Sequence, residues 1–273
     1  MSMARQEKDL LEARLGDAIE KRERGETAYL SFLTPRERKR AERLLREWGA
    51  YHAAFFFGGY SEAERVCLFL LPEYLTDCLP APVAECEAET VKELLGESLS
   101  EAVSALRISG SGFHKHTHRD FLGSVLGLGI ERDALGDIAV QNEFEAVLFC
   151  PQALLPFFMT HLERVGNDAV KVREYQPDAS FTDGKSYQRI TDTVASARLD
   201  CVVAALCNLS REAAQAAIRS GTVEVEFEIC ERPDLSLEPP VTLSVRGFGR
   251  FILRSFDGET RKGRLRLSAD RLI

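Results

Sequence analysis

Hydrophobic positions recur at helical spacing in the first segment of the chain, residues 5–22, among dense charges. A second helix is expected after it, because Thr34 and Glu37 have the spacing of a capping box and Pro35 suits the first helical turn. Gly49 is the expected end of this helix. Two apolar strands are expected next, near residues 52–57 and 65–71. We interpret residues 1–98 as a small N-terminal α+β unit.

Between residues 99 and 176, the hydrophobic pattern predicts elements in the order strand, helix, strand, strand, helix, strand. The expected elements are Val103–Ser109, Arg119–Leu128, Asp137–Gln141, Glu145–Cys150, Gln152–Val165 and Ala169–Tyr175. This order predicts a ferredoxin-like βαββαβ domain, a scaffold that several RNA-binding modules share. Phe149 is the one aromatic residue on its two central strands, which disfavours base stacking on the sheet. The polar stretch 177–189, with Pro177 and Gly184, is predicted to be a linker.

Residues 190–273 have the clearest pattern. Apolar residues from Leu199 to Leu206 predict a short helix, and Ser210 caps a second helix that Gly221 ends. Apolar residues then alternate with glutamates over 223–229, which predicts one strand with a buried face. A strand over 241–245 and a turn at Asp257-Gly258 follow. The segment is therefore two short helices followed by a small antiparallel sheet, and the whole chain belongs to the α+β class.

Charge is distributed unevenly along the chain. The formal net charge is −8, but residues 194–273 hold 12 Lys+Arg against 11 Asp+Glu, a balance of +1. Within 246–271 the balance is eight basic residues against three acidic ones. A basic end on an acidic chain suits a local anionic partner better than diffuse binding to any polyanion.

The composition and motifs exclude several classes of protein. No run of about 18 apolar residues exists, so we expect no membrane partner, and the charged N-terminus does not resemble a secretion signal. The seven cysteines include no Cys-x-x-Cys pair, which indicates reduced core residues of a cytoplasmic protein. There is no Walker loop, dinucleotide fingerprint or nucleophile elbow. We therefore expect no cofactor and no enzymatic activity.

Several motifs in 190–273 resemble the S-four type RNA-binding domain. The matching residues are Ala197-Arg198-Leu199-Asp200, Ser210-Arg211 and Ile218-Arg219-Ser220-Gly221-Thr222-Val223. Domains of this type often have Lys or Asn on the strand after this turn, whereas Glu224, Glu226 and Glu228 stand there in this sequence. Any RNA surface is therefore expected on the helix pair and the basic C-terminal strands.

Three further segments resemble the bacterial YlmH family more particularly. They are Gly112–Gly123, Arg246–Arg250 and Thr260–Arg264. The resemblance implies an N-terminal unit, a ferredoxin-like middle domain and a C-terminal S-four type domain. It also implies a ribosome-associated factor that binds large-subunit ribosomal RNA and tRNA during rescue of stalled nascent chains. We expect the protein to be a monomer. Two alternatives remain open: an RNA-modifying enzyme that uses the C-terminal domain as a clamp, and a cell-division interaction factor.

The candidate RNA-binding residues lie at helix starts and on basic strands or turns. Arginine at a helix start adds a bidentate phosphate ligand to an end that already favours anions. The expected contacts are Arg198, Asp200, Ser210, Arg211, Arg219, Arg246, Arg250, Arg261, Lys262 and Arg264.

A second candidate RNA contact lies before the first helix of the middle domain. Its residues are His114, Lys115, His116 and Arg119. His114, His116 and His118 would share a face of an extended segment, as metal ligands can, but no neighbouring cysteine or carboxylate pair completes a site. Thr117 and Asp120 have capping-box spacing, so we interpret this segment as a structured loop and expect no metal.

Overall fold

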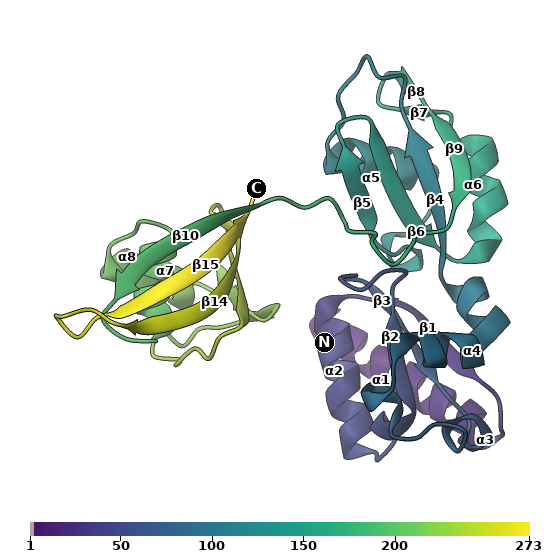
Figure 1. Ribbon diagram of the computed structural model, residues 1–273, viewed down its shortest axis with the longest axis horizontal. Coiled ribbons are helices and arrows are strands. Elements are labelled where there is room, and N and C mark those ends of the chain that lie inside the picture. The colour runs from purple at the N-terminus through teal and green to yellow at the C-terminus, as the bar shows by residue number, and fades with distance from the viewer. Residues whose placement is uncertain (1–2) are drawn as a thin grey trace. The chain divides into compact units, whose positions relative to one another are not determined.

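The computed structural model describes residues 3–273, the first seven of them by their backbone alone (Figure 1). The chain divides into two compact units, 1–184 and 185–273. The first unit therefore contains both the predicted N-terminal unit and the predicted middle domain. The mixed α and β fold class is confirmed.

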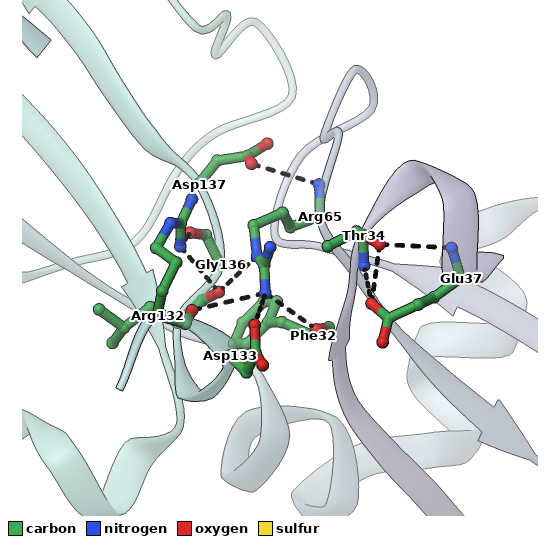
Figure 2. Close-up of polar contacts among 9 residues, drawn as sticks. Phe32, Thr34, Glu37, Arg65, Arg132, Asp133, Gly136 and Asp137 are labelled. Atoms are coloured by element: carbon green, nitrogen blue, oxygen red, sulfur yellow. Dashed lines mark hydrogen bonds and ion pairs between the residues drawn. The ribbon is translucent and has the colours of Figure 1, made fainter. Parts of the chain in front are cut away.

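The N-terminal part of the first unit is a three-stranded antiparallel sheet with helices packed against it. Its strands are β1 (Ala28–Leu33), β2 (Ala54–Phe57) and β3 (Val66–Leu70), in the order β1-β3-β2. The predicted helices are present as α1 (Met3–Glu23) and α2 (Pro35–Glu47). Thr34 and Glu37 form the expected capping box (Figure 2). The sequence analysis did not predict β1, α3 (Glu73–Thr76) or α4 (Ala88–Ala102).

The middle part forms a four-stranded antiparallel sheet. Its elements are β4 (Ser104–Ser109), α5 (His118–Leu126), β5 (Ile138–Asn142), β6 (Glu145–Cys150), α6 (Leu155–His161) and β9 (Lys171–Tyr175). The strand order β5-β6-β4-β9 is that of a ferredoxin-like sheet. The predicted helix 152–165 is shorter than expected, because 3₁₀ turn 152–154 precedes α6 and β7 (Arg164–Val165) follows it. Strand β7 pairs with β8 (Asp168–Ala169) as a small hairpin.

Part of one face of this four-stranded sheet packs against the N-terminal part. Phe149 is fully buried in a core that also contains Phe32, Tyr60 and Phe69. The rings of Tyr60 and Phe149 stack with centroids 5.1 Å apart. Phe149 is therefore unavailable for base stacking, as the sequence led us to expect.

A polar network joins the two parts of the first unit (Figure 2). The buried Arg65 donates through Nε to the carbonyl oxygen of Leu135 (2.8 Å) and through Nη2 to that of Phe32 (3.3 Å). In return, Asp137 accepts hydrogen bonds from the backbone of Arg65 and from the hydroxyl of Tyr60. The bonds to Leu135 and Asp137 connect residues 70 to 77 positions apart, so they stabilise one compact unit rather than two independent domains.

The segment predicted as a linker, 177–189, is largely built into the two units. Phe181 and Asp183 are buried, and Gln141 Nε2 donates to the carbonyl oxygen of Thr182 (2.9 Å). Residues from Tyr187 onward already form strand β10 (Tyr187–Val194). The linker prediction was too long because a polar stretch can pack by hydrogen bonds as well as by apolar side chains.

The second unit combines a helix pair with a six-stranded antiparallel sheet. The helices are α7 (Leu199–Leu206) and α8 (Arg211–Arg219). With β10, the strands are β11 (Val223–Val225), β12 (Glu228–Ile229), β13 (Val241–Val245), β14 (Gly249–Glu259) and β15 (Leu265–Leu272). Their order is β10-β15-β14-β13-β11-β12, and the core lies between this sheet and the helices.

Two local predictions in this unit were wrong. The alternating segment 223–229 is a tight hairpin, with Glu226 and Phe227 at φ 53° and 68°, so Ile229 is 52% exposed instead of buried. Asp257-Gly258 lies inside β14 at an irregularity in the pairing with β15, and the turn follows it at residues 260–263.

Two further observations concern the whole described chain. None of the described helices is long and apolar enough to cross a lipid bilayer. All seven cysteines are unpaired, and Cys67, Cys150 and Cys207 are buried.

Candidate nucleic-acid interface

The carboxylate of Asp200 organises the helix pair of the second unit. Arg198 binds it through two nitrogens, Nε at 3.1 Å and Nη2 at 3.0 Å. Arg211 donates to it through Nε (3.1 Å), and Gln215, one turn further along α8, donates through Nε2 (2.7 Å). Asp200 is fully buried, whereas the side chains of Arg198 and Arg211 are 39% and 55% exposed. One buried anion thus holds two partly exposed guanidinium groups together.

The protonation state of Asp200 follows from these contacts. Burial alone would raise the pKa of the carboxyl group. Hydrogen bonds from Arg198, Gln215 and Arg211 outweigh burial and hold the pKa of Asp200 well below its usual range. Asp200 is therefore ionised at neutral pH and neutralises part of the charge of its arginine partners.

Two predicted contacts in the helix pair need correction. Asp200 was expected to contact RNA, but its side chain has no exposed surface, so its role is to position the arginines. The hydroxyl of Ser210 accepts a hydrogen bond from the amide of Ala213 (3.1 Å) and serves as a helix cap. The start of α7 is also less open than expected, because the amides of Leu199 and Asp200 donate to the carbonyl oxygens of Leu235 and Pro233.

The remaining basic residues lie at two ends of the sheet. Arg261 and Lys262 are exposed in the β14–β15 turn. Arg264 is exposed beside them and donates to Thr193 at the end of β10, five residues before the N-cap of α7. This group is therefore at the end of the sheet that leads into the helix pair (Figure 1).

Arg246 lies at the other end, in the β13–β14 turn, where its amide donates to the carbonyl oxygen of Thr222 just after α8. Arg219 is exposed in the last turn of α8. Arg250 is half-buried, with its guanidinium 5.2 Å from the ring centre of Phe227. From the sequence, the basic residues of the C-terminal strands and turns were expected to form one surface. The strand pairing instead separates them into two groups.

The predicted second RNA contact lies in a loop of the first unit. This loop is held in place by Asp168, a residue that was not predicted from the sequence. Asp168, on β8, accepts hydrogen bonds from the amide of Ser111 (3.0 Å) and from Nε2 of the buried His116 (3.1 Å). His114 Nδ1 lies 3.6 Å from the other carboxylate oxygen. Lys115 and Arg119 are exposed. Asp168 is 52 residues from His116 in sequence, so no local pattern could reveal the pair.

Among the described residues, no group of three His, Cys, Asp or Glu side chains is placed so that it could hold a metal ion. Hydrogen bonds from Ser111 and His116 hold the pKa of Asp168 well below its usual range, although desolvation opposes them. Thr117 and Asp120 form the predicted capping box of α5.

The fold and these sites define an α+β protein with cationic surfaces on both of its units. A family model described as "Putative RNA-binding domain in YlmH" matches residues 103–179, which is the ferredoxin-like part. The chain is 29% identical over 240 residues to the Ribosome-associated protein quality control protein P2 of Bacillus subtilis (strain 168), covering 88% of this chain and 85% of that protein. These matches confirm the resemblance to the YlmH family noted in the sequence.

Among solved structures, the Cell division protein ylmH from Streptococcus pneumoniae matches with a TM-score of 0.47 and 21% identity. That match covers 64% of this chain and 93% of the other. The family model lies on the middle part of the chain, where the sequence led us to expect only a second RNA contact. The S-four type assignment of residues 190–273 stays a prediction.

Proposed function

We propose that this protein is a non-catalytic RNA-binding factor that acts as a monomer on the ribosome. In this proposal the second unit binds ribosomal RNA of the large subunit together with tRNA, in quality control of stalled nascent chains. The protein would work in the cytoplasm, where ribosomes are found. Its binding energy would come from phosphate contacts and would depend strongly on salt.

The observation that carries the proposal is the arginine pair on Asp200. Arg198 and Arg211 come from the starts of two helices and are fixed by one buried carboxylate. The bond to Arg211 uses Nε, which leaves its terminal nitrogens for another acceptor. Guanidinium groups fixed in this way lose little side-chain entropy on binding phosphate. The exposed Arg261, Lys262 and Arg264 add charge at the same end of the sheet.

The comparison supports the cellular setting. The Bacillus subtilis relative, whose alignment covers 88% of this chain, is named as a ribosome-associated quality control protein. The non-catalytic part of the proposal has its own test. Mass spectrometry of ribosomal RNA incubated with the protein should show no mass change.

The test is co-sedimentation of the full chain with 50S particles over a salt series. Binding should fall roughly a hundredfold between 50 and 200 mM salt if about four phosphates are neutralised. Arg198→Ala combined with Arg211→Ala should weaken binding and lower the slope of log K against log salt by about 2. Arg24→Ala with Arg254→Ala removes the same charge from side chains that are 62% and 48% exposed, and serves as the matched control.

A second variant separates binding from folding, because Arg198 also supports Asp200. Arg261→Ala with Lys262→Ala changes only exposed side chains of a turn. It should lower the salt slope without altering the circular dichroism spectrum. Unchanged sedimentation of both double variants, each folded, would refute the assignment of the second unit.

A further inference from the structure

Phe113 is the most exposed large hydrophobic side chain among residues 10–273, at 88%. A single exposed apolar side chain is ordinary in itself. Phe113 differs because it lies at the tip of a loop that is held firmly on both sides. The loop, residues 110–117, connects β4 to α5 at the end of the sheet where the β7–β8 hairpin lies (Figure 1).

The base of this loop is fixed by one buried carboxylate. Asp168 is 4% exposed and accepts hydrogen bonds from Ser111 and His116, with His114 beside it. The amides of Gly110 and His116 donate to the carbonyl oxygens of Phe144 (2.8 Å) and Glu143 (2.7 Å). Residues on both sides of Phe113 are thus attached to the body of the unit.

The glycine at position 110 is required by this arrangement. A Cβ atom there would lie 2.8 Å from the Asp168 carboxylate, too close for any other residue without a shift. Gly112, next to Phe113, has φ +85°, a conformation that favours glycine. The backbone therefore turns outward at the tip, and the ring of Phe113 projects without packing against the core.

Cationic and ionisable side chains lie close to Phe113 in the sequence. His114 and Lys115 follow Phe113 directly, with side chains 64% and 70% exposed, and Arg119 is exposed in the first turn of α5. Lys115 forms an ion pair with Glu143 (2.7 Å), and because both side chains are exposed, the pair contributes little to stability. An aromatic face beside positive charge suits a nucleobase whose flanking phosphates meet those charges.

We propose that Phe113 is a stacking platform for an unpaired base of structured RNA, with Asp168 as the residue that positions the loop. The proposal rests on the proposed function, since it assumes that the protein binds RNA. It assigns a specific contact to the part of the chain that matches the RNA-binding family model. It also explains how a ferredoxin-like sheet whose Phe149 is buried can still offer an aromatic ring.

The test uses the fluorescence of a tryptophan placed at the tip. The chain has one tryptophan, Trp48, so Phe113→Trp in a Trp48→Phe background gives a single reporter. Two RNA probes are compared with the full chain: a hairpin with an unpaired purine loop, and a blunt duplex of equal length. We expect quenching by the hairpin and little change with the duplex, because stacking needs an unpaired base.

Affinity measurements distinguish stacking from general hydrophobic contact. Phe113→Leu keeps an apolar side chain without a ring and should weaken hairpin binding about tenfold, whereas Phe113→Tyr should bind like the wild type. Asp168→Asn should weaken hairpin binding in the wild-type background and have a smaller effect in the Phe113→Leu background. That coupling would show that Asp168 acts through Phe113.

Each contrary outcome has a defined meaning. If the wild type binds both probes with salt dependence but Phe113→Leu binds the hairpin equally well, the stacking platform is refuted and the proposed function stands. The stacking platform is also refuted if RNA binds while neither probe quenches the tryptophan. If the wild type binds neither the probes nor 50S particles, the proposed function fails and this inference fails with it.

Discussion

Replacement of Asp200 should destabilise the second unit by about 2–3 kcal/mol. The fully buried carboxylate accepts four hydrogen bonds, two from Arg198 and one each from Arg211 and Gln215. Removing one partner of a buried ion pair costs about 3–5 kcal/mol, because the remaining charge is left uncompensated. Solvent screens the two arginines, which are 39% and 55% exposed, so the lower end of that range or slightly less applies.

Hydrogen exchange measured by mass spectrometry can locate this effect in the full chain. In Asp200→Ala, amides of α7 and α8 that open with the second unit should exchange roughly 30- to 150-fold faster, since 1.4 kcal/mol corresponds to a factor of ten. Peptides from residues 1–184 should exchange as in the wild type. Asp257→Asn, at an exposed position, is the control. Unchanged exchange of α7 in Asp200→Ala would show that the carboxylate is dispensable.

The same residue gives a prediction for pH. The pKa of Asp200 is lower in the folded protein than the value of about 3.9 expected when unfolded. Its contribution to stability is therefore complete above about pH 4 and is lost as the pH falls toward the folded pKa. The difference in unfolding free energy between the wild type and Asp200→Asn should be constant from pH 5 to 8 and shrink below pH 4. A difference that grows on acidification would contradict this reasoning.

Two further predictions concern the first unit. Arg65→Met should lower the free energy of unfolding of this unit, measured in urea, by about 2–4 kcal/mol, because buried carbonyl oxygens lose their donor. Arg24→Met, at an exposed position, should change it by less than about 0.5 kcal/mol. Equal effects of the two variants would refute the role of the network. Burial raises the pKa of the Cys67 and Cys150 thiols to about 12. Iodoacetamide at pH 8 should therefore alkylate the exposed Cys78 well before either of them. Similar alkylation rates for the three cysteines, measured by peptide mapping, would count against the packing.

The sequence predicted well those features that depend on neighbouring residues. The capping box of Thr34 and Glu37 needs only residues three positions apart, and Ser210 caps α8 for the same reason. Strand β13, Val241–Val245, alternates between buried and half-buried positions as its sequence predicts. The order of strands and helices in the ferredoxin-like part was also predicted correctly, because each element has its own hydrophobic periodicity.

The failures share a different cause. The hairpin at Glu226 and Phe227 has two residues with positive φ and no glycine, so the usual turn signal is absent and the alternation looked continuous. Burial of Asp200 depends on partners as far away as Gln215 and on the loop that covers α7. The role of Asp168 depends on a contact across 52 residues. Such features follow from tertiary packing and leave no local pattern.

The length of β14 decides how the basic residues of the second unit can meet RNA. Arg246 precedes this strand and Arg261 follows it, and its 11 residues extend roughly 36 Å at about 3.3 Å per residue. Neighbouring phosphates along one RNA strand are much closer than that, so the two groups cannot grip adjacent positions. An RNA that contacts both must run along the unit or present phosphates from separate parts of a folded structure. Simultaneous contact with both groups therefore requires an RNA that spans the length of β14, which a few nucleotides of a single strand cannot do.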